Sequence, residues 1–373
     1  MRFSEIFRSY DWIIIGTALL LTCVGLAMLF SASSEDSLFS ARFIRQISSV
    51  SVAFGIFIIV SAFPYHSLKH YVIPIYILGL GGLLIVSQVG RSVRGTVSRL
   101  ELHGVQIQPS EFIKIALIIV LAWYFARKKV ISLSAVLYSA ALVGLATTLV
   151  ALEPDIGVAA LIMTLWIVMM IFIGTPWRYI LTLGFLGIIG FWAAWYWMFA
   201  EYQKARIATF INPTGDPLGA GYNITQSIVA LGSGGLLGRG LGHGPQSQLK
   251  FLPEQHTDFI LASIGEELGF IGIALVVSLY TILLWRILKI ARNTRDPFGQ
   301  YLAVGIFIML LISFFVSTRM NMGLLPVTGI PLPLVSFGGS NMVSTFILLA
   351  IIQSIHVHGK WVQRPPSEIT HIT

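Results

Sequence analysis

One stretch of the chain combines glycines, polar side chains and acids directly ahead of a long apolar run. Residues 232–270 read GSGGLLGRGLGHGPQSQLKFLPEQHTDFILASIGEELGF. Leucines and charges interrupt the glycines, which favours a folded loop over a flexible spacer. A carboxylate held at the boundary between water and lipid can serve as a general base. Asp258 is our candidate for that role.

The same stretch also permits a purely structural interpretation. Asp258 would then cap an apolar helix and complement its dipole. Glu266 and Glu267 follow about two turns later. Adjacent acids at that depth must face protein or water, or be protonated, and we expect structural hydrogen bonding for them. Small residues recur on one face of this helix and would serve helix packing: Ala262, Gly265, Gly269 and Gly272.

A second polar group opens another apolar run, in the sequence Gln108-Pro109-Ser110-Glu111-Phe112-Ile113-Lys114. Proline suits the first helical position, and Glu111 can fold back as in a capping box. Glu111 and Lys114 are three residues apart and therefore neighbours on a helix. They are either a self-neutralising pair that eases insertion, or a carboxylate and a cation lining the cavity of Asp258. For Glu153-Pro154-Asp155, at the start of another run, we favour helix capping.

The composition defines the class of protein that must position these groups. The chain has 373 residues, of which 56% are hydrophobic and only 11% charged, against about 25% charged in soluble domains. It is therefore predicted to be a polytopic membrane protein with no soluble domain. The net charge of +8 indicates basic cytoplasmic loops and not nucleic-acid binding. Cys23 is the only cysteine, which excludes a disulfide framework, and no phosphate-binding loop of the Walker type is present.

The predicted fold is all-α, a single integral membrane domain over residues 1–373. The basic loops place both termini in the cytoplasm. A large extracytoplasmic loop, about 200–257, then separates helices seven and eight, and an irregular, re-entrant segment is expected at about 319–340 because prolines and glycines interrupt it. About ten runs are long enough to span a membrane: 12–30, 43–63, 71–89, 110–126, 131–151, 156–173, 178–199, 259–285, 300–318 and 342–358.

Several basic residues fall on the predicted outer side. Arg91, Arg94 and Arg99, in the loop 90–109, oppose the positive-inside rule. Either they bind an anionic ligand, or the neighbouring spans override them. Arginine makes bidentate contacts to phosphate, so further outer residues are candidates for holding one. These are Arg206, Arg239, Lys250 and Arg319.

Several long motifs, in order, resemble the SEDS family (shape, elongation, division and sporulation), and most closely its RodA-type members. They are QPSEFIK, EPDIG, the stretch from NPTGDPLGAGYN to ASIGEELGF, and PVTGIPLPLVSFGGSNM. The resemblance implies a peptidoglycan glycosyltransferase that polymerises lipid II at the outer face of the bacterial cytoplasmic membrane during cell elongation. It implies a class B penicillin-binding protein as partner. The family's essential aspartate falls on Asp258, and its glutamate and lysine fall on Glu111 and Lys114.

The expected reaction needs one base and a source of positive charge. Lipid II carries a pyrophosphate leaving group, and its acceptor is a sugar hydroxyl, so a single carboxylate suffices for an inverting displacement. Asp258 would be the base, and Lys114, Arg206 or a divalent cation (Mg or Mn) would neutralise the pyrophosphate. No cofactor is certain. Substrate contacts are expected from the following residues: Glu111, Lys114, Arg206, Gln246, Glu254, His256, Thr257, Arg319 and Ser336.

Two other functions fit a polytopic protein with intramembrane charges. One is a transporter or flippase for the lipid-linked precursor, although the polar candidates cluster on one side and no internal repeat is evident. The other is a non-catalytic scaffold for a penicillin-binding protein. The scaffold predicts that substitutions of Asp258 are tolerated, whereas the enzyme predicts that they are not.

Overall fold

The computed structural model describes residues 8–31, 41–89, 91–93, 96–102, 105–128, 131–197, 199–212, 220–249 and 251–361. Among these residues, nine helices are long and apolar enough to cross a membrane, and a tenth apolar helix is slightly shorter. The prediction of about ten spans is therefore confirmed. The ten are α2 (Trp12–Ser31), α3 (Ala41–Ala62), α4 (Leu68–Val89), α5 (Pro109–Ala126), α6 (Leu133–Leu152), α7 (Ile156–Phe172), α8 (Trp177–Trp197), α12 (Ile260–Asn293), α13 (Pro297–Asn321) and α14 (Gly339–Trp361).

Local sequence signals set several helix starts. Proline occupies the first turn of α5 and of α13, where its missing N–H costs nothing. Three N-cap side chains accept a hydrogen bond from the first turn of their helix: Ser132 in α6, Asp155 in α7 and Asp296 in α13. A short 3-10 turn, η1 (Tyr65–Ser67), leads directly into α4. The capping role predicted for Asp155 is confirmed.

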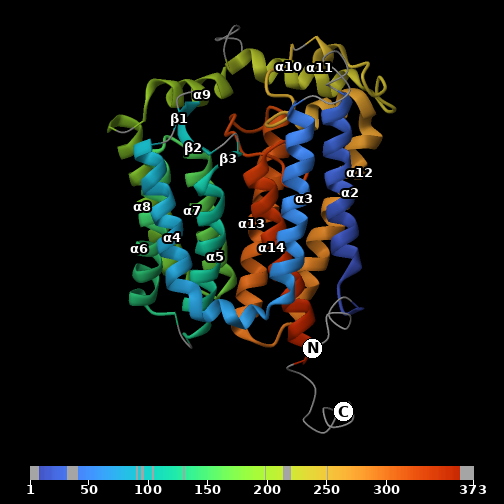
Figure 1. Cartoon of the computed structure of the whole chain (residues 1–373). Coiled ribbons are helices and arrows are strands. Elements are labelled where there is room, and N and C mark those ends of the chain that lie inside the picture. Colours follow the sequence, from blue (N-terminus) through green and yellow to red (C-terminus); the bar gives the residue numbers. More distant parts are fainter. Residues whose placement is uncertain are drawn as a thin grey trace.

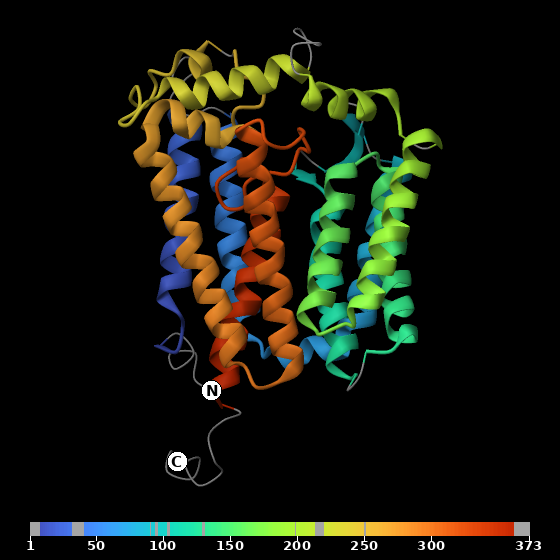
Figure 2. The ribbon, with the colours of Figure 1, turned by 180° about the vertical axis from the view of Figure 1, so that it is seen from behind.

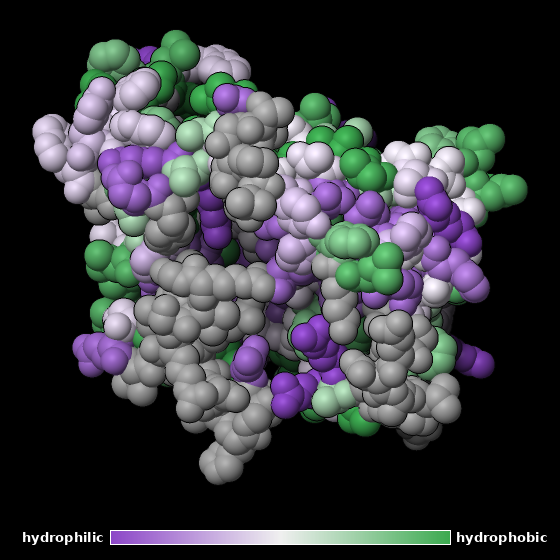
Figure 3. All heavy atoms as spheres, turned by 90° about the horizontal axis from the view of Figure 1, so that it is seen from above, coloured by the Kyte–Doolittle hydropathy of each residue, from purple (hydrophilic) through white to green (hydrophobic). Residues whose placement is uncertain are grey.

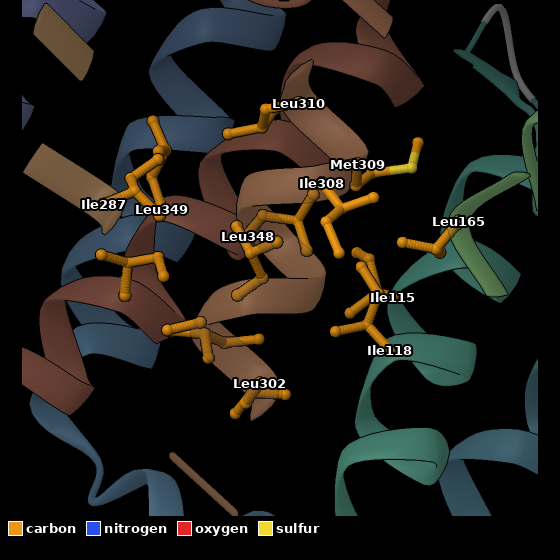
Figure 4. Packing of buried hydrophobic residues seen from close by; sticks show 14 of the residues in the cluster. Ile115, Ile118, Leu165, Ile287, Leu302, Ile308, Met309, Leu310, Leu348 and Leu349 are labelled. Carbon is orange, nitrogen blue, oxygen red and sulfur yellow. The ribbon is translucent and has the colours of Figure 1, made fainter. Parts of the chain in front are cut away.

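The helices form two groups that meet at α13. Helices α2, α3, α12 and α14 lie on one side of α13, and α4 to α8 lie on the other (Figures 1 and 2). Helix α13 contacts α12 and α14 in the first group, and α5 and α7 in the second. Figure 4 shows this core: Ile308 of α13 lies between Leu348 of α14 and Ile118 of α5. The buried apolar side chains form a nearly continuous cluster through both groups.

The two ends of the bundle differ. Helices α9 (Glu201–Ile211), α10 (Ala220–Ser233) and α11 (Pro245–Gln248) lie across one end, which we call the loop end (Figure 1). Helix α2 begins, and α14 ends, at the opposite end, which we call the terminal end. Three helices therefore lie within the loop predicted at about 200–257.

A small antiparallel sheet lies where only a loop was expected. Its strands, in the order β1 (Arg91–Val93), β2 (Thr96–Leu102) and β3 (Val105–Ile107), connect α4 to α5 at the loop end. Arg91 pairs with Arg99 in the register. The side chains of the three predicted outward arginines lie outside the described part of the structure, as does Lys250.

Helix α12 is not the single straight span that the hydropathy predicted. Its backbone breaks at Gly269, where φ is +66° and ψ is −161°. Glycine tolerates this conformation because it has no Cβ. The backbone N–H of Phe270 and of Ile271 then bonds to carbonyls of Gly235 and Leu236, in the glycine-rich loop. Residues 260–268 are therefore a separate short helix at the loop end. Gly269 was predicted to belong to a stripe of small residues on one continuous helix, but it is the residue at which the helix breaks.

Residues 322–338, between α13 and α14, contain neither helix nor strand. Apolar side chains in the second half of the segment are buried, as Ile330, Leu332 and Val335 show. The backbone packs closely against two helices. A Cβ atom added to Gly25 of α2 would lie 2.2 Å from the carbonyl oxygen of Val335, and one added to Gly157 of α7 would lie 2.2 Å from that of Thr328. We call residues 322–338 the wall segment.

Candidate active site

Asp258 lies in the turn that leads into α12. The helix begins at Ile260 and its N-cap is Phe259, which provides no side-chain cap. The capping interpretation of Asp258 is therefore wrong. The residue is half-buried, and a Cβ atom added to Gly329 would lie 3.9 Å from its Oδ2. The Asp258 carboxyl group thus faces the wall segment.

Asn321, the last residue of α13, fixes this turn. Its side chain is fully buried, and its Nδ2 donates to the backbone carbonyl of Asp258 (2.8 Å) and of Ser317 (2.8 Å). Its Oδ1 accepts from the backbone N–H of Ala262 (3.0 Å), in the first turn of α12. The hydroxyl of Ser227, on α10, donates to the Asn321 carbonyl (2.8 Å). Through its side-chain amide and its backbone carbonyl, Asn321 therefore joins three helices behind Asp258, a role that the sequence analysis missed.

Glu111 and Lys114 form a buried ion pair in the first turns of α5. The distance from Lys114 Nζ to Glu111 Oε1 is 2.7 Å, and both side chains are at most 5% exposed. Glu111 Oε2 accepts from Asn341 Nδ2 (3.2 Å) and Ser344 Oγ (2.9 Å), on α14. Because Glu111 bonds to these partners and its helix has no side-chain cap, the predicted capping box does not form. The pair instead joins α5 to α14.

Asp155 interacts electrostatically with Lys114 of this pair and with Arg206 of α9. One carboxylate oxygen caps α7 through the N–H of Val158 (3.1 Å), and the other lies 3.5 Å from Gln108 Nε2. Burial raises the pKa of Asp155, while the Val158 hydrogen bond and the positive charges of Lys114 and Arg206 oppose the rise. Lys114 and Arg206, both predicted to face a phosphate, therefore lie close enough to act on one carboxylate.

The wall segment connects the two polar groups. Thr328 packs against Gly157, two residues after Asp155, and the next residue, Gly329, lies beside Asp258. The turn of Asp258 and the start of α7, where Asp155 caps the helix, thus both pack against neighbouring residues of the same short segment. Seen from the loop end, hydrophilic side chains mix with apolar ones over this face (Figure 3).

Other predicted substrate-binding residues have structural roles near Asp258. Ser336 is buried; its hydroxyl donates to the Thr257 carbonyl (2.7 Å) and accepts from the Leu332 N–H (2.9 Å). The Thr257 hydroxyl donates to Glu254 Oε2 (2.8 Å). Ser336 and Thr257 therefore hold the turn of Asp258 to the wall segment.

His256 is neutral at physiological pH. Burial, assisted by the positive charge of Arg42 at the start of α3, lowers its pKa from 6.5 to about 4. A neutral imidazole carries no positive charge, so His256 does not neutralise the pyrophosphate. Arg42 itself is exposed and acts on His256, two residues from Asp258, so it is a cation of this site that the sequence analysis did not select.

Two predicted residues lie apart from this group. Arg319 is exposed on α13, with its guanidinium 4.6 Å from the centre of the Phe315 ring. Two residues along a helix are about 200° apart, so Arg319 faces away from the side occupied by Asn321. Gln246 lies in α11, and its N–H donates to Glu266 (2.7 Å).

Glu266 and Glu267 are buried by the glycine-rich loop. Glu266 accepts bonds from the N–H groups of Gln246 (2.7 Å) and Ser247 (3.0 Å). Glu267 accepts from the hydroxyl of Ser31, at the end of α2 (2.5 Å). The predicted structural hydrogen bonding is confirmed. These bonds hold the first part of α12, and thus the turn of Asp258, to α11 and α2.

Glu153 is buried without a partner among the described residues. It is 0% exposed, and neither carboxylate oxygen accepts a hydrogen bond from them, so its predicted capping role is wrong. Burial, and then the nearby Asp155, raises its pKa from 4.5 to about 8. The folded protein therefore binds more protons than the unfolded chain between these two values, and its stability falls as the pH rises through that window.

We expect Glu153→Gln to remove this pH dependence. Above about pH 7 the variant should unfold at a higher temperature than the wild type. Its free energy of unfolding should no longer show the decrease of up to about 1.4 kcal/mol per pH unit that Glu153 causes. Thermal unfolding in detergent across the window measures both effects. Glu201→Gln is the control, since the Glu201 side chain is 90% exposed. Equal pH dependence in wild type and Glu153→Gln would contradict the prediction.

Ten apolar helices with a buried acid–base group at one end define a multi-pass membrane protein with a polar site at the loop end. The chain belongs to the FTSW_RODA_SPOVE family of cell cycle proteins, whose model matches residues 11–361. The resemblance inferred from the motifs is thus confirmed.

Its relatives cover almost the whole chain. It is 36% identical to the peptidoglycan glycosyltransferase MrdB of Escherichia coli (strain K12) over 343 residues, 90% of each protein. It is 34% identical to the probable peptidoglycan glycosyltransferase FtsW of Geobacter sulfurreducens (strain DL-1 / KN400) over 369 residues, 95% of this chain and 97% of that protein.

Solved structures show the same fold. A chain from a study of the structural coordination of polymerization and crosslinking by a peptidoglycan synthase complex matches with a TM-score of 0.82 and 26% identity, covering 94% of this chain and 98% of that one. The crystal structure of the rod shape determining protein RodA of Thermus thermophilus matches with a TM-score of 0.70 and 24% identity, covering 93% and 96%.

Proposed function

We propose that this protein is a peptidoglycan glycosyltransferase that polymerises lipid II into glycan strands for cell elongation. The names and coverage of its relatives support this activity. The observation that carries the proposal is the position of Asp258. Its carboxyl group faces Gly329, and the adjoining Thr328 packs against Gly157, two residues after Asp155. The proposed base and the start of α7, where Lys114 and Arg206 act on Asp155, thus meet at one short segment.

The proposed chemistry follows from these charges. Asp258 takes the proton of the acceptor sugar hydroxyl, whose oxygen attacks the anomeric carbon of the donor with inversion. The bond from that carbon to the pyrophosphate breaks, and the undecaprenyl pyrophosphate leaves with the electron pair. Lys114 and Arg206, with Arg42 on the side of His256, supply positive charge to the leaving group.

A divalent cation would need additional ligands. Within the described ranges, no group of three or more His, Cys, Asp or Glu side chains is arranged to hold a metal ion. The acids of this site bond to protein partners instead: Glu111 to Lys114, and Asp155 to the N-terminus of α7. The described residues therefore do not by themselves form a site for Mg or Mn.

The proposed orientation places the loop end outside the bacterial cytoplasmic membrane and both termini in the cytoplasm. Basic residues at the terminal end support it, since the positive-inside rule assigns them to the cytoplasm; they include Lys69, Arg127 and Arg286. We further propose a class B penicillin-binding protein as partner. A structural neighbour described as part of a complex for both polymerization and crosslinking supports that pairing.

The function is tested by the product that the purified protein makes. Reconstituted protein given fluorescent lipid II should produce a ladder of glycan strands on a gel, and the assay is run with and without a divalent cation to measure any dependence on it. A flippase would instead return unpolymerised lipid II on the opposite side of the vesicle. Translocated monomer without polymer would overturn the proposal in favour of transport.

We expect Gly157→Ala to impair polymerisation from outside the reacting groups. The added methyl group would meet the Thr328 carbonyl oxygen at 2.2 Å, so the wall segment beside Asp258 has to move. Activity should fall by on the order of tenfold or more, as expected for misplaced reacting groups. Gly144→Ala is the control, because its added Cβ meets nothing within 4 Å. Equal activities in the two variants would show that Thr328 and Gly329 do not shape the site.

A further inference from the structure

A small cavity is lined by residues of α4, the end of α5 and the start of α13. These helix ends lie at the terminal end of the bundle, opposite the loop end (Figure 1). Its volume is about 110 Å³, which is room for several water molecules or one small anion. The proposed polymerisation does not use it. It is lined by Lys69, Trp123, Ala126, Arg127, Asp296, Pro297 and Phe298.

Three of the lining residues carry hydrogen-bond donors. The guanidinium of Arg127 lies 3.9 Å from the centre of the Trp123 ring and makes no ion pair with the described residues. Trp123 Nε1 is buried, and it too has no hydrogen-bond partner within the part of the chain that the structure describes. A buried indole N–H without an acceptor is unfavourable unless a ligand or water supplies one. Lys69 provides the third donor.

One acid also lines the cavity, and its charge is already compensated. Asp296 lies 3.4 Å from Lys69 Nζ and 3.5 Å from His66 Nε2, and it accepts the N–H of Gly299 (3.2 Å). Arg127 therefore contributes a positive charge that no acid among the described residues balances with an ion pair. The ligand that complements this one cation, together with the N–H donors of Lys69 and Trp123, is an anion with several acceptor oxygens, such as a phosphate group.

We propose that this cavity binds the phosphate of an anionic phospholipid from the leaflet at the terminal end. The neighbouring side chains are those of a membrane interface: Trp123 and Tyr124 supply aromatic rings, and Lys128 lies 5.2 Å from the Tyr124 ring centre. Basic pockets between membrane helices are typical sites for anionic headgroups. The site is independent of the glycosyltransferase activity and would join α4, α5 and α13 through one lipid.

The test compares lipids and matched variants of the full-length protein. Native mass spectrometry and thermal unfolding in detergent are followed while phosphatidylglycerol, phosphatidylcholine or inorganic phosphate is added. Wild-type protein should retain phosphatidylglycerol in preference to phosphatidylcholine. Phosphatidylglycerol should also raise its unfolding temperature more than phosphatidylcholine does. Arg127→Gln should weaken that binding by on the order of tenfold. Trp123→Phe, which keeps a ring but removes the N–H, should weaken it by roughly threefold.

Arg178→Gln is the control, because Arg178 is another exposed basic residue at the same end, with its guanidinium 4.8 Å from the Tyr179 ring centre. Unchanged phosphatidylglycerol binding in Arg178→Gln, together with the losses above, supports a built site. Equal losses in Arg178→Gln and Arg127→Gln would reduce the effect to general surface charge and overturn the proposal. Equal protection by inorganic phosphate would assign the cavity to a soluble anion and overturn the lipid assignment.

Discussion

Asp258→Asn should abolish polymerisation of lipid II by the purified protein. Asparagine has nearly the same shape but cannot accept the proton of the acceptor hydroxyl. Loss of a general base costs about 10²- to 10⁴-fold in rate, which places the variant near the detection limit of a gel assay. The assay compares glycan strands formed by wild type and variant at equal protein concentration.

This substitution should leave folding intact. The side chain does not cap α12, whose N-cap is Phe259. The bond from Asn321 reaches the backbone carbonyl of Asp258 and is therefore unaffected. Unfolding temperature and binding of the partner protein should match the wild type. Glu201→Gln controls for loss of an acid at the same end of the molecule. Wild-type activity in Asp258→Asn would remove the residue from its role and favour the scaffold interpretation.

The second large effect is expected for Lys114→Met. It removes a buried ammonium group 2.7 Å from Glu111 and leaves a buried carboxylate without its counter-charge. Breaking a buried ion pair from one side costs about 3–5 kcal/mol. If the same ammonium also stabilises the leaving pyrophosphate, activity should fall by on the order of a hundredfold or more. Thermal unfolding and the lipid II assay measure the two effects separately.

The double variant Glu111→Gln with Lys114→Met separates pairing from chemistry. Replacing both partners by neutral groups of similar size is often close to neutral for stability, so the unfolding temperature should recover. In the wild type, Glu111 accepts hydrogen bonds from Asn341 and Ser344. The side-chain amide oxygen introduced at position 111 can accept the same two bonds. Activity should remain lost if Lys114 neutralises the pyrophosphate. Recovery of activity together with stability would show that the pair is structural.

Local sequence determined the helices of this protein. An apolar run of about 20 residues can satisfy its backbone in a membrane only as a helix or as a strand of a closed barrel, so composition and length located the ten helices. Capping chemistry is also local, and the capping role of Asp155 was predicted correctly because its capping bond comes from Val158, three residues along the chain. The break at Gly269 was missed because it depends on residues 235 and 236, far away in the sequence.

The chemical types of the candidate residues were readable from the sequence, but their partners were not. Asp258, Glu111 and Lys114 were selected from their types, their spacing and their motifs. Their arrangement depends on bonds between distant segments, such as Asn321 to Asp258 and Ser344 to Glu111. Asn321 ends an apolar run and carries no charge, so it gave no signal by itself. Side-chain periodicity describes one helix at a time, whereas a site is built where several helices end, and only their packing decides which ends meet.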